Sequence, residues 1–379
     1  MPPAGDGRQP RPEILSDAER IAWLRLTRTD RVGPILFRDL LDHFGSALAA
    51  VDALPALTRQ GGARQALTVS PADDAEAELV RAAAFGARYV ASVEPDYPKH
   101  LSTVDAPPPL LAMKGAANVG QANAVAIVGA RNCSAAGAKF AARLAAELGA
   151  AGFWIVSGLA RGIDGAAHRA ALETGTLAVF AGGLDRIYPP EHKTLVDQIL
   201  EAGGTIASER PFGFSARGQD FPRRNRIVSG ASLGIVVIEA ARRSGTLHTA
   251  RRGLEQNREI FAAPGGPLDP RSEGANRLIR DGAHLVTEAA HIIEVLNPIA
   301  GIRPESPPFF HEPSGAPSPD PRESDRDAVL VALGSTPIEV DELVRFCGLP
   351  VRVVQRVLIE LDLAERIERR PDQRISLRF

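Results

Sequence analysis

Between Ala124 and Leu285 the chain alternates short, fully apolar runs with stretches of helical pattern. The clearest runs are residues 124–129 (AVAIVG), 153–158 (FWIVSG), 176–183 (TLAVFAGG) and 233–240 (LGIVVIEA). Strands that are apolar on both faces are typical of parallel sheets covered by helices on both sides. The alternation therefore predicts an α/β domain with a Rossmann-like parallel sheet, whose ligands lie at the carboxyl ends of the strands.

A basic segment interrupts an otherwise slightly acidic chain. Residues 210–258 hold ten arginines and three acidic residues, whereas the whole chain has a net charge of −2. A local excess of this kind favours a polyanionic partner, and phosphate is the commonest one. Two predicted helix starts lie inside the segment, after Phe221 and at residues 244–246 (SGT), and a helix N-terminus is a ready anion site. A solvated basic face is the plainer alternative.

Motifs for bond-breaking chemistry are missing. The first strand–helix loop, residues 129–134 (GARNCS), lacks the glycine spacing of a dinucleotide site, and Arg131 places a cation where phosphate would lie. Asp164 and His168 are four residues apart on one helix, which is too few ligands for a metal site. Cys133 begins a helix that could lower its pKa, but no base stands near it in sequence. The sequence thus predicts binding without catalysis, with no cofactor and no metal.

Prolines and helical patterns divide the chain further. Ser16 and Glu19 have the spacing of a capping box at the start of a helical region. We expect a disordered leader (1–13), a helical domain of SAM or helix-hairpin-helix type (14–95), the Rossmann-like domain (96–297), a proline-rich linker (298–322) and a winged helix (323–379) whose hairpin turns at Pro371-Asp372.

The winged-helix segment carries nine arginines against eleven acidic residues. Its third helix offers only Arg352 and Arg356 to a DNA groove, so binding of a partner or autoregulation is as plausible as DNA reading. The helical N-terminal segment likewise has no basic excess, and a small capping bundle is the alternative to DNA contact. With two distant cysteines, no apolar run of membrane-spanning length and no signal sequence, we expect a reduced, cytoplasmic protein away from membranes.

A series of motifs in order along residues 124–283 resembles the DprA/Smf family, the DNA-processing proteins of natural transformation. They read GARNCSAAG, SGLARGID, GLDRIYPPE, FPRRNRIVSGAS, VIEAARRSGTLHTA and APGGPLDPRSEGANRLIRDGA. The resemblance implies a non-enzymatic, dimeric protein that binds and protects single-stranded DNA in a basic pocket and loads RecA recombinase in competence and homologous recombination. His248, His192 and the loop GFSARGQD depart from the family pattern and affect loop detail.

The resemblance also implies a set of binding residues. Arg131 would hold phosphate, and Arg223, Arg242 and Arg243 would broaden the positive field. Because aromatic residues make up only 5% of the chain, we expect base stacking to be limited to Phe221 and a neighbour such as Phe212 or Phe214. The full predicted site is Gly129, Arg131, Ser157, Gly158, Phe221, Arg223, Arg224, Asn225, Arg226, Arg243, Ser244, Gly245 and Thr246.

Two other classes remain as alternatives. A phosphoribohydrolase resembling the LOG-type enzymes would share the general fold, but their PGGxGTxxE motif is not matched by APGGPLDP or by RRSGTLHTARRGLE. A purely structural or protein-docking module would leave the ten arginines of the basic segment unexplained. Binding of single-stranded DNA explains more of these sequence features than either alternative does.

Overall fold

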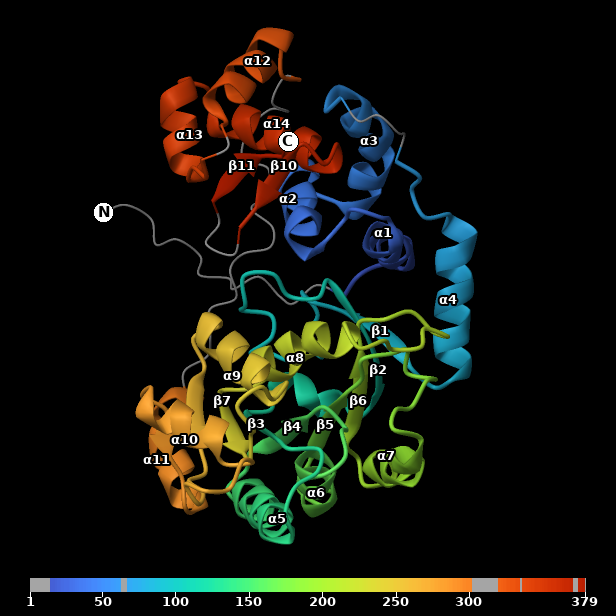
Figure 1. The fold of residues 1–379 in the computed structure, drawn as a ribbon. Coiled ribbons are helices and arrows are strands. Elements are labelled where there is room, and N and C mark those ends of the chain that lie inside the picture. The colour runs from blue at the N-terminus through green and yellow to red at the C-terminus, as the bar shows by residue number, and fades with distance from the viewer. Residues whose placement is uncertain (1–13, 63–66, 302–319, 335, 371–373, 379) are drawn as a thin grey trace, which may run out of the picture. The chain divides into compact units, whose positions relative to one another are not determined.

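The computed structural model describes residues 14–62, 67–301, 320–334, 336–370 and 374–378 (Figure 1). The predicted leader, most of the predicted linker (302–319) and the hairpin turn at Pro371-Asp372 lie outside these residues. Within them the chain forms two compact units, and the second combines segments from the beginning and the end of the sequence. The first unit contains residues 78–301 together with Ile14, and the second joins Leu15–Ala77 to the described residues after 319.

The first unit is built on one nine-stranded sheet in the order β1-β2-β6-β5-β4-β3-β7-β8-β9. Seven strands, β3 to β9, run parallel to one another. The strands are β1 (Arg88–Ala91), β2 (Leu110–Gly115), β3 (Ala124–Gly129), β4 (Trp154–Ser157), β5 (Thr176–Val179), β6 (Thr205–Ser208), β7 (Gly234–Ile238), β8 (Glu259–Ala262) and β9 (His284–Leu285).

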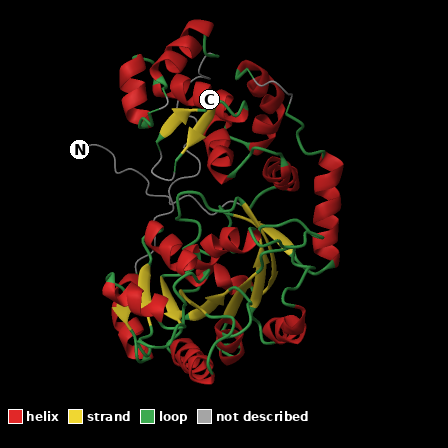
Figure 2. Cartoon of the chain, in the orientation of Figure 1, coloured by secondary structure: helices red, strands yellow, loops and turns green. Residues whose placement is uncertain are grey.

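Helices cover both faces of this sheet (Figure 2). Alternate residues of β3 enter two separate apolar cores, Ala126 with the helices α8 and α9, and Ile127 with α5, α6 and α11. This division is what a doubly covered parallel sheet requires of a wholly apolar strand. The helices are α4 (Ala72–Ala84), α5 (Ala135–Ala150), α6 (Ile163–Ala170), α7 (Lys193–Glu201), α8 (Asp220–Gly230), α9 (Thr246–Glu255), α10 (Glu273–Arg280) and α11 (Ala289–Ala300), with short 3₁₀ turns at Ala117–Gln121 and Pro190–His192.

One edge of the sheet differs from the sequence expectation. Strand β2 runs antiparallel to β6, and β1 runs antiparallel to β2. The sequence does not indicate these strands clearly, because the apolar run LLAM at the start of β2 directly follows a proline-rich segment with a turn pattern. Strand β1 lies before the boundary expected at residue 95, yet it belongs to this sheet.

The second unit contains α1 (Asp17–Arg28), α2 (Pro34–Phe44) and α3 (Ala47–Gln60) together with the winged helix. The winged helix consists of α12 (Glu323–Ala332), α13 (Val340–Cys347), α14 (Val351–Leu363), β10 (Ile367–Arg369) and β11 (Ile375–Leu377). The predicted three helices and two-stranded wing are therefore confirmed, and α14 packs against both α2 and α3. In the described ranges no single helix is long and apolar enough to cross a membrane; only α2 and α3 taken together, bent by 105°, pass on length and composition.

Candidate nucleic-acid interface

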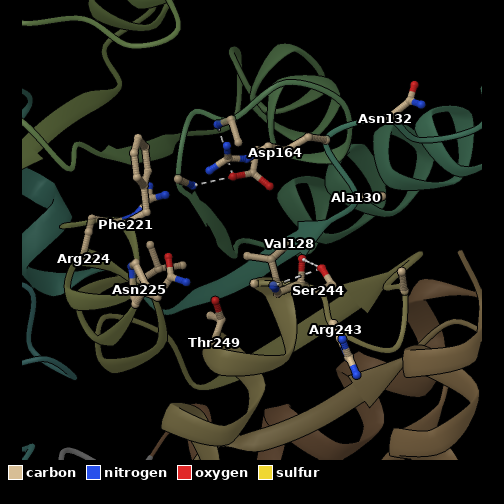
Figure 3. Close-up of a pocket in the computed structure, with 18 of the residues that line it drawn as sticks. Val128, Ala130, Asn132, Asp164, Phe221, Arg224, Asn225, Arg243, Ser244 and Thr249 are labelled. Atoms are coloured by element: carbon tan, nitrogen blue, oxygen red, sulfur yellow. Dashed lines mark hydrogen bonds between the residues drawn. The ribbon is translucent and has the colours of Figure 1, made fainter. Parts of the chain in front are cut away.

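A cavity of about 600 Å³ opens where the strand order of the sheet reverses (Figure 3). Strand β3 has β4 on one side and β7 on the other, so the loops after β3 and β7 diverge and leave a crevice between them. The predicted placement of the site at the carboxyl ends of the strands agrees with this geometry. The lining residues are Val128, Ala130, Arg131, Asn132, Gly158, Ala160, Asp164, Phe221, Pro222, Arg224, Asn225, Val228, Ala241, Arg243, Ser244, Gly245, Thr246, Thr249 and Arg271.

Exposed guanidinium groups converge on this cavity from two loops. Arg131 follows β3 and Arg243 follows β7, and both are exposed. Among the described residues, neither lies within ion-pair distance of a carboxylate, and the same is true of their exposed neighbours Arg223 and Arg242. Cations without a protein counter-ion near a cavity attract an anionic ligand, because their charge is otherwise balanced only by solvent ions.

The N-terminus of α9 also faces the cavity. Gly245 is its N-cap and has no side-chain cap, while the Ser244 hydroxyl accepts a hydrogen bond from the Thr246 N–H (3.2 Å). The Thr246 hydroxyl donates to the Gly129 carbonyl (3.1 Å), which fixes this turn against the end of β3. The N–H groups of Thr246, Leu247 and His248 already donate to Ser244 and Gly245, so what the first turn of α9 presents at the cavity wall is the positive end of the helix dipole.

The other helix N-terminus at the switch point is already filled. The Glu239 carboxylate accepts hydrogen bonds from the backbone N–H of Ser134 (2.8 Å) and from its hydroxyl, at the start of α5. A dinucleotide pyrophosphate would occupy this position in a Rossmann fold. Glu239 has a positive φ of 51°. Its carboxylate occupies the place that a dinucleotide pyrophosphate would take, which agrees with the absence of the dinucleotide-binding motif from the sequence.

Arg224 lies beneath the cavity and is only 7% exposed. Its Nη1 donates to the Val179 carbonyl (2.6 Å), and its guanidinium lies so close to Gly158 that a Cβ there would meet Nη1 at 2.0 Å. Burial lowers the pKa of Arg224 to about 10, with nearby Asp164 opposing the shift, so it stays protonated at neutral pH. Asp164 in turn accepts from the N–H groups of Gly158 (3.1 Å) and Ala160 (3.3 Å), and this buried pair shapes the loop after β4.

An aromatic face borders the cavity mouth. The Arg131 guanidinium lies over the Phe221 ring, 5.0 Å from its centroid, and Tyr188 packs beside the same ring at a centroid distance of 5.4 Å. Of the neighbours suggested for base stacking beside Phe221, Phe212 packs against Phe85 and Phe214 lies under Arg210, and the ring that contacts Phe221 is Tyr188. Tyr188 and Phe221 also line a smaller adjoining cavity of about 280 Å³.

Four predicted site residues lie outside the main cavity. Ser157 is fully buried and donates its hydroxyl to the Ile127 carbonyl (2.6 Å), and Gly129 sits where a Cβ would meet the Ile238 carbonyl at 1.9 Å. Arg226 is paired with Glu209, and Arg223 is exposed without lining the cavity. Ser157 and Gly129 therefore support the crevice from behind rather than offering groups to a ligand.

The basic segment does not form one continuous surface. Arg210 pairs with Asp220, Arg251 and Arg252 pair with Glu255, and Arg258 donates to the carbonyls of His100 and Gly230. Together with Arg224 and Arg226, six of its ten arginines have partners within the protein, although Arg251 and Arg252 are exposed. The exposed positive charge at the cavity is consequently more local than the sequence count suggests.

Several lining residues were not predicted from the sequence. Asn132, Thr249 and Arg271 line the cavity, and Tyr188 stands at its mouth. Asn132 directly follows Arg131 in the same loop, so its position next to a predicted site residue could have indicated it. Arg271 is far away in sequence and is paired with Asp269, and nothing local marks it.

Two residues considered from the sequence as a metal ligand or a reactive thiol, His168 and Cys133, have surroundings that do not favour these roles. His168 contacts the Thr176 hydroxyl through Nδ1 (2.7 Å), and no cluster of three or more potential metal ligands occurs among the described residues. Burial, with Glu239 nearby, raises the pKa of Cys133, which is opposite to the lowering its helix position predicts.

Comparison with known proteins gives consistent matches along the chain. A family model described as DNA recombination-mediator protein A matches residues 88–297, a DprA-like N-terminal HHH domain matches 17–82, and a DprA winged helix domain matches 313–373. The chain is 40% identical to protein Smf of Escherichia coli over 74% of this chain and 75% of that protein.

Streptococcus pneumoniae provides a second relative and a solved structure. The DNA processing protein DprA of this organism is 42% identical over 52% of this chain and 70% of that protein. The X-ray structure of S. pneumoniae DprA superposes with a TM-score of 0.54 at 38% identity, covering 59% of this chain and 77% of that one.

Proposed function

The chain belongs to the DNA recombination-mediator protein A family, and from this premise we propose that it binds single-stranded DNA at the switch-point cavity. The resemblance to DprA/Smf that the sequence motifs predict is thereby confirmed, and with it a DNA-processing role. The site residues assigned from those motifs remain part of the proposal.

One observation carries the proposal. Arg131 and Arg243, neither paired with a carboxylate among the described residues, converge with the positive end of the α9 dipole on a cavity that also presents the Phe221 ring. Phosphate binds guanidinium forks and helix N-termini, and a nucleobase stacks on an aromatic face. A cavity of about 600 Å³ admits a short stretch of flexible strand, whereas the paired backbones of a duplex keep its bases out of such a recess.

The chemistry of the cavity favours binding over catalysis. Its one carboxylate, Asp164, is buried and occupied by backbone N–H groups, so it is badly placed to act as a general base. We propose that the protein acts by holding DNA rather than by cleaving it. Incubation with nucleoside monophosphates tests the alternative, because hydrolysis would point to a phosphoribohydrolase.

The binding test is fluorescence anisotropy with a labelled single-stranded oligonucleotide and its duplex, each at about 50 and 200 mM salt. We expect a salt-sensitive preference for the single strand. Arg131→Ala should weaken binding by about 1–3 kcal/mol, since it removes a charged phosphate contact. Arg143→Ala is the matched control, because Arg143 is exposed on α5 and paired with Glu147. Equal affinities of Arg131→Ala and wild-type protein would contradict the assignment of the cavity.

On the family resemblance we also propose that the protein works as a homodimer, protects incoming single strands and loads RecA recombinase during natural transformation. Sedimentation of the purified chain tests the dimer. Faster RecA filament formation on a single strand, in the presence of the protein, tests the loading. Arg131→Ala should reduce that stimulation in proportion to its loss of DNA affinity.

A further inference from the structure

A smaller cavity of about 280 Å³ adjoins the proposed DNA-binding cavity and shares a wall with it. Five of its eight lining residues also line the larger cavity, and Arg131 and Phe221 are among them. Because the Arg131 guanidinium lies over the Phe221 ring, this stacked pair belongs to the shared wall. A strand whose phosphate is held by Arg131 in the larger cavity is therefore already at the border of the smaller one.

Tyr188 provides the open aromatic surface of the smaller cavity. It is 53% exposed, whereas Phe221 is half-buried, with Arg131 over its face and Tyr188 beside it. A nucleobase gains most by stacking on a ring that still faces water, because apolar surface of both partners is then removed from solvent. Tyr188 is therefore better placed than Phe221 to accept a base.

The loop that carries Tyr188 is fastened to the loop after β4. His192, four residues after Tyr188, is buried, and its Nδ1 contacts the Leu159 carbonyl (2.9 Å). Glu191, between them, accepts a hydrogen bond from Arg161. These two contacts hold the Tyr188 loop in place before a ligand arrives, which reduces the ordering entropy that binding must offset.

The charges along the smaller cavity separate a place for phosphate from a place for a base. Arg131 has no carboxylate partner among the described residues, whereas Arg161, the other cation of the lining, is paired with Glu191. Tyr188 and Pro189, which complete the lining, add aromatic and apolar surface. A phosphate is therefore expected at Arg131, and an uncharged base at the Tyr188 end.

The size of the cavity limits what it can hold. Pockets for small molecules measure roughly 300–1,000 Å³, so a cavity of about 280 Å³ has room for about one nucleobase. We propose that the smaller cavity binds one unstacked base of a single strand against the Tyr188 ring, while an adjoining phosphate lies on Arg131. This base subsite rests on the proposed single-strand binding at the larger cavity.

Tyr188 thereby selects single strands over duplexes. A base in a duplex is paired and stacked, so it reaches the Tyr188 ring only by being flipped out of the helix, whereas a base of a single strand is free to enter.

The test combines substitutions of Tyr188 with a strand that lacks bases. Anisotropy of the full chain is measured with a labelled thymidine oligonucleotide and with an abasic strand of the same length. Tyr188→Ala should bind the thymidine strand at least about fivefold more weakly, because it removes the stacking surface. Its affinity for the abasic strand should stay within about twofold of wild-type protein, since the phosphate contacts remain. Tyr188→Phe, which keeps the ring, is the matched control and should stay within about twofold of wild-type protein on both strands.

Three further outcomes bear on the base subsite. The preference for a single strand over its duplex should fall in Tyr188→Ala by the same factor as the affinity for the thymidine strand. Equal weakening of the thymidine and abasic strands by Tyr188→Ala would overturn the base subsite, because Tyr188 would then only support the loop. Unchanged binding of both strands would also overturn it, because the base would then lie elsewhere.

Arg131→Ala distinguishes the base subsite from single-strand binding itself. Its phosphate contact does not depend on a base, so it should weaken binding of both strands. That result, combined with no effect of Tyr188→Ala, would remove the base subsite and leave the larger cavity as the binding site. Failure of wild-type protein to bind the thymidine strand would instead overturn the proposed function, and the base subsite with it.

Discussion

Arginines with the same predicted role have different surroundings, which sequence alone does not distinguish. Arg131 and Arg224 belong to motifs that suggest the same phosphate-binding role. In the structure Arg131 is exposed over Phe221, whereas Arg224 is buried below Gly158 and bonded to the Val179 carbonyl. In the proposed site, Arg131 would contact the ligand, and Arg224 would hold the loop after β4 in position.

Arg224→Ala should therefore be mainly a stability variant. It leaves Asp164 buried without its nearby cation, and we expect a loss on the order of 3 kcal/mol in the free energy of unfolding. Urea denaturation measures this loss. Arg131→Ala, at an exposed position, should change the same quantity by less than about 0.5 kcal/mol. Equal stability of the two variants would contradict the buried role of Arg224.

Buried histidines make the first unit sensitive to acid. Burial, with His192 and Arg224 adding to it, lowers the pKa of His168 to about 3. The folded protein therefore keeps His168 neutral while the unfolded chain, with a pKa near 6.5, gains a proton. The stability from this group is complete above pH 6.5 and falls as the pH drops from 6.5 towards 3.

His168→Gln tests this linkage. A neutral glutamine removes the difference of one proton, so the fall in unfolding free energy should become shallower by up to about 1.4 kcal/mol per pH unit between pH 4 and 6. Urea titrations at several pH values in that range measure the slope. His100, whose pKa is lowered to about 4 by burial, should retain its share in both proteins. Identical slopes would show that His168 does not contribute.

At the scale of elements, two helix N-termini at the switch point have opposite roles. The start of α5 is closed by Glu239, whereas the start of α9 lies at the cavity wall. The closure requires a carboxylate from the loop after β7 to reach the loop after β3, which the parallel pairing of these neighbouring strands makes possible. We therefore expect an incoming phosphate to bind near the start of α9 rather than at α5.

Glu239→Ala should remove this cap. By analogy with the loss of an N-cap, we expect it to lower the free energy of unfolding by about 1–2 kcal/mol. Thermal or urea denaturation gives the value. Glu255→Ala, which removes an exposed carboxylate at the other end of α9, is the control. A loss no greater than that of the control would mean that the Glu239 contact with Ser134 contributes little.

At the scale of the whole molecule, the two compact units carry separate surfaces. The cavity proposed to bind single-stranded DNA lies within the first unit, and the winged helix and the N-terminal helices belong to the second. The acidic balance of the winged helix, expected to make it a poor DNA reader, agrees with its third helix being used as an internal interface.

Deletion of residues 323–379 tests this division. Because the cavity residues all precede this segment, we expect the affinity for single-stranded DNA to stay within about threefold of the full chain. The same deletion uncovers apolar faces of α2 and α3, so the shortened protein should aggregate more readily. Anisotropy and light scattering measure the two effects. Loss of most single-strand affinity would place part of the site in the winged helix.

The local sequence determined the repeating core and the outline of the site. Fully apolar runs such as residues 124–129 and 234–238 can only be satisfied between two helical layers, so the parallel sheet and its ligand-binding edge follow from periodicity alone. Glycine-rich loops and SGT at a helix start are equally local signals, so the sequence can name Arg131, Ser244, Gly245 and Thr246, which line the cavity, although their role as binding residues stays a prediction.

Only the tertiary structure decided which charged groups are available. The burial of Arg224, the pairing of Arg226 with Glu209, and the reach of Glu239 to Ser134 all depend on neighbours far away in sequence. The antiparallel β1 and β2 and the contact of α14 with α3 have the same origin. Periodicity records which face of an element is apolar, but not which partner covers it, and electrostatic pairing depends on distances that arise only when the chain has folded.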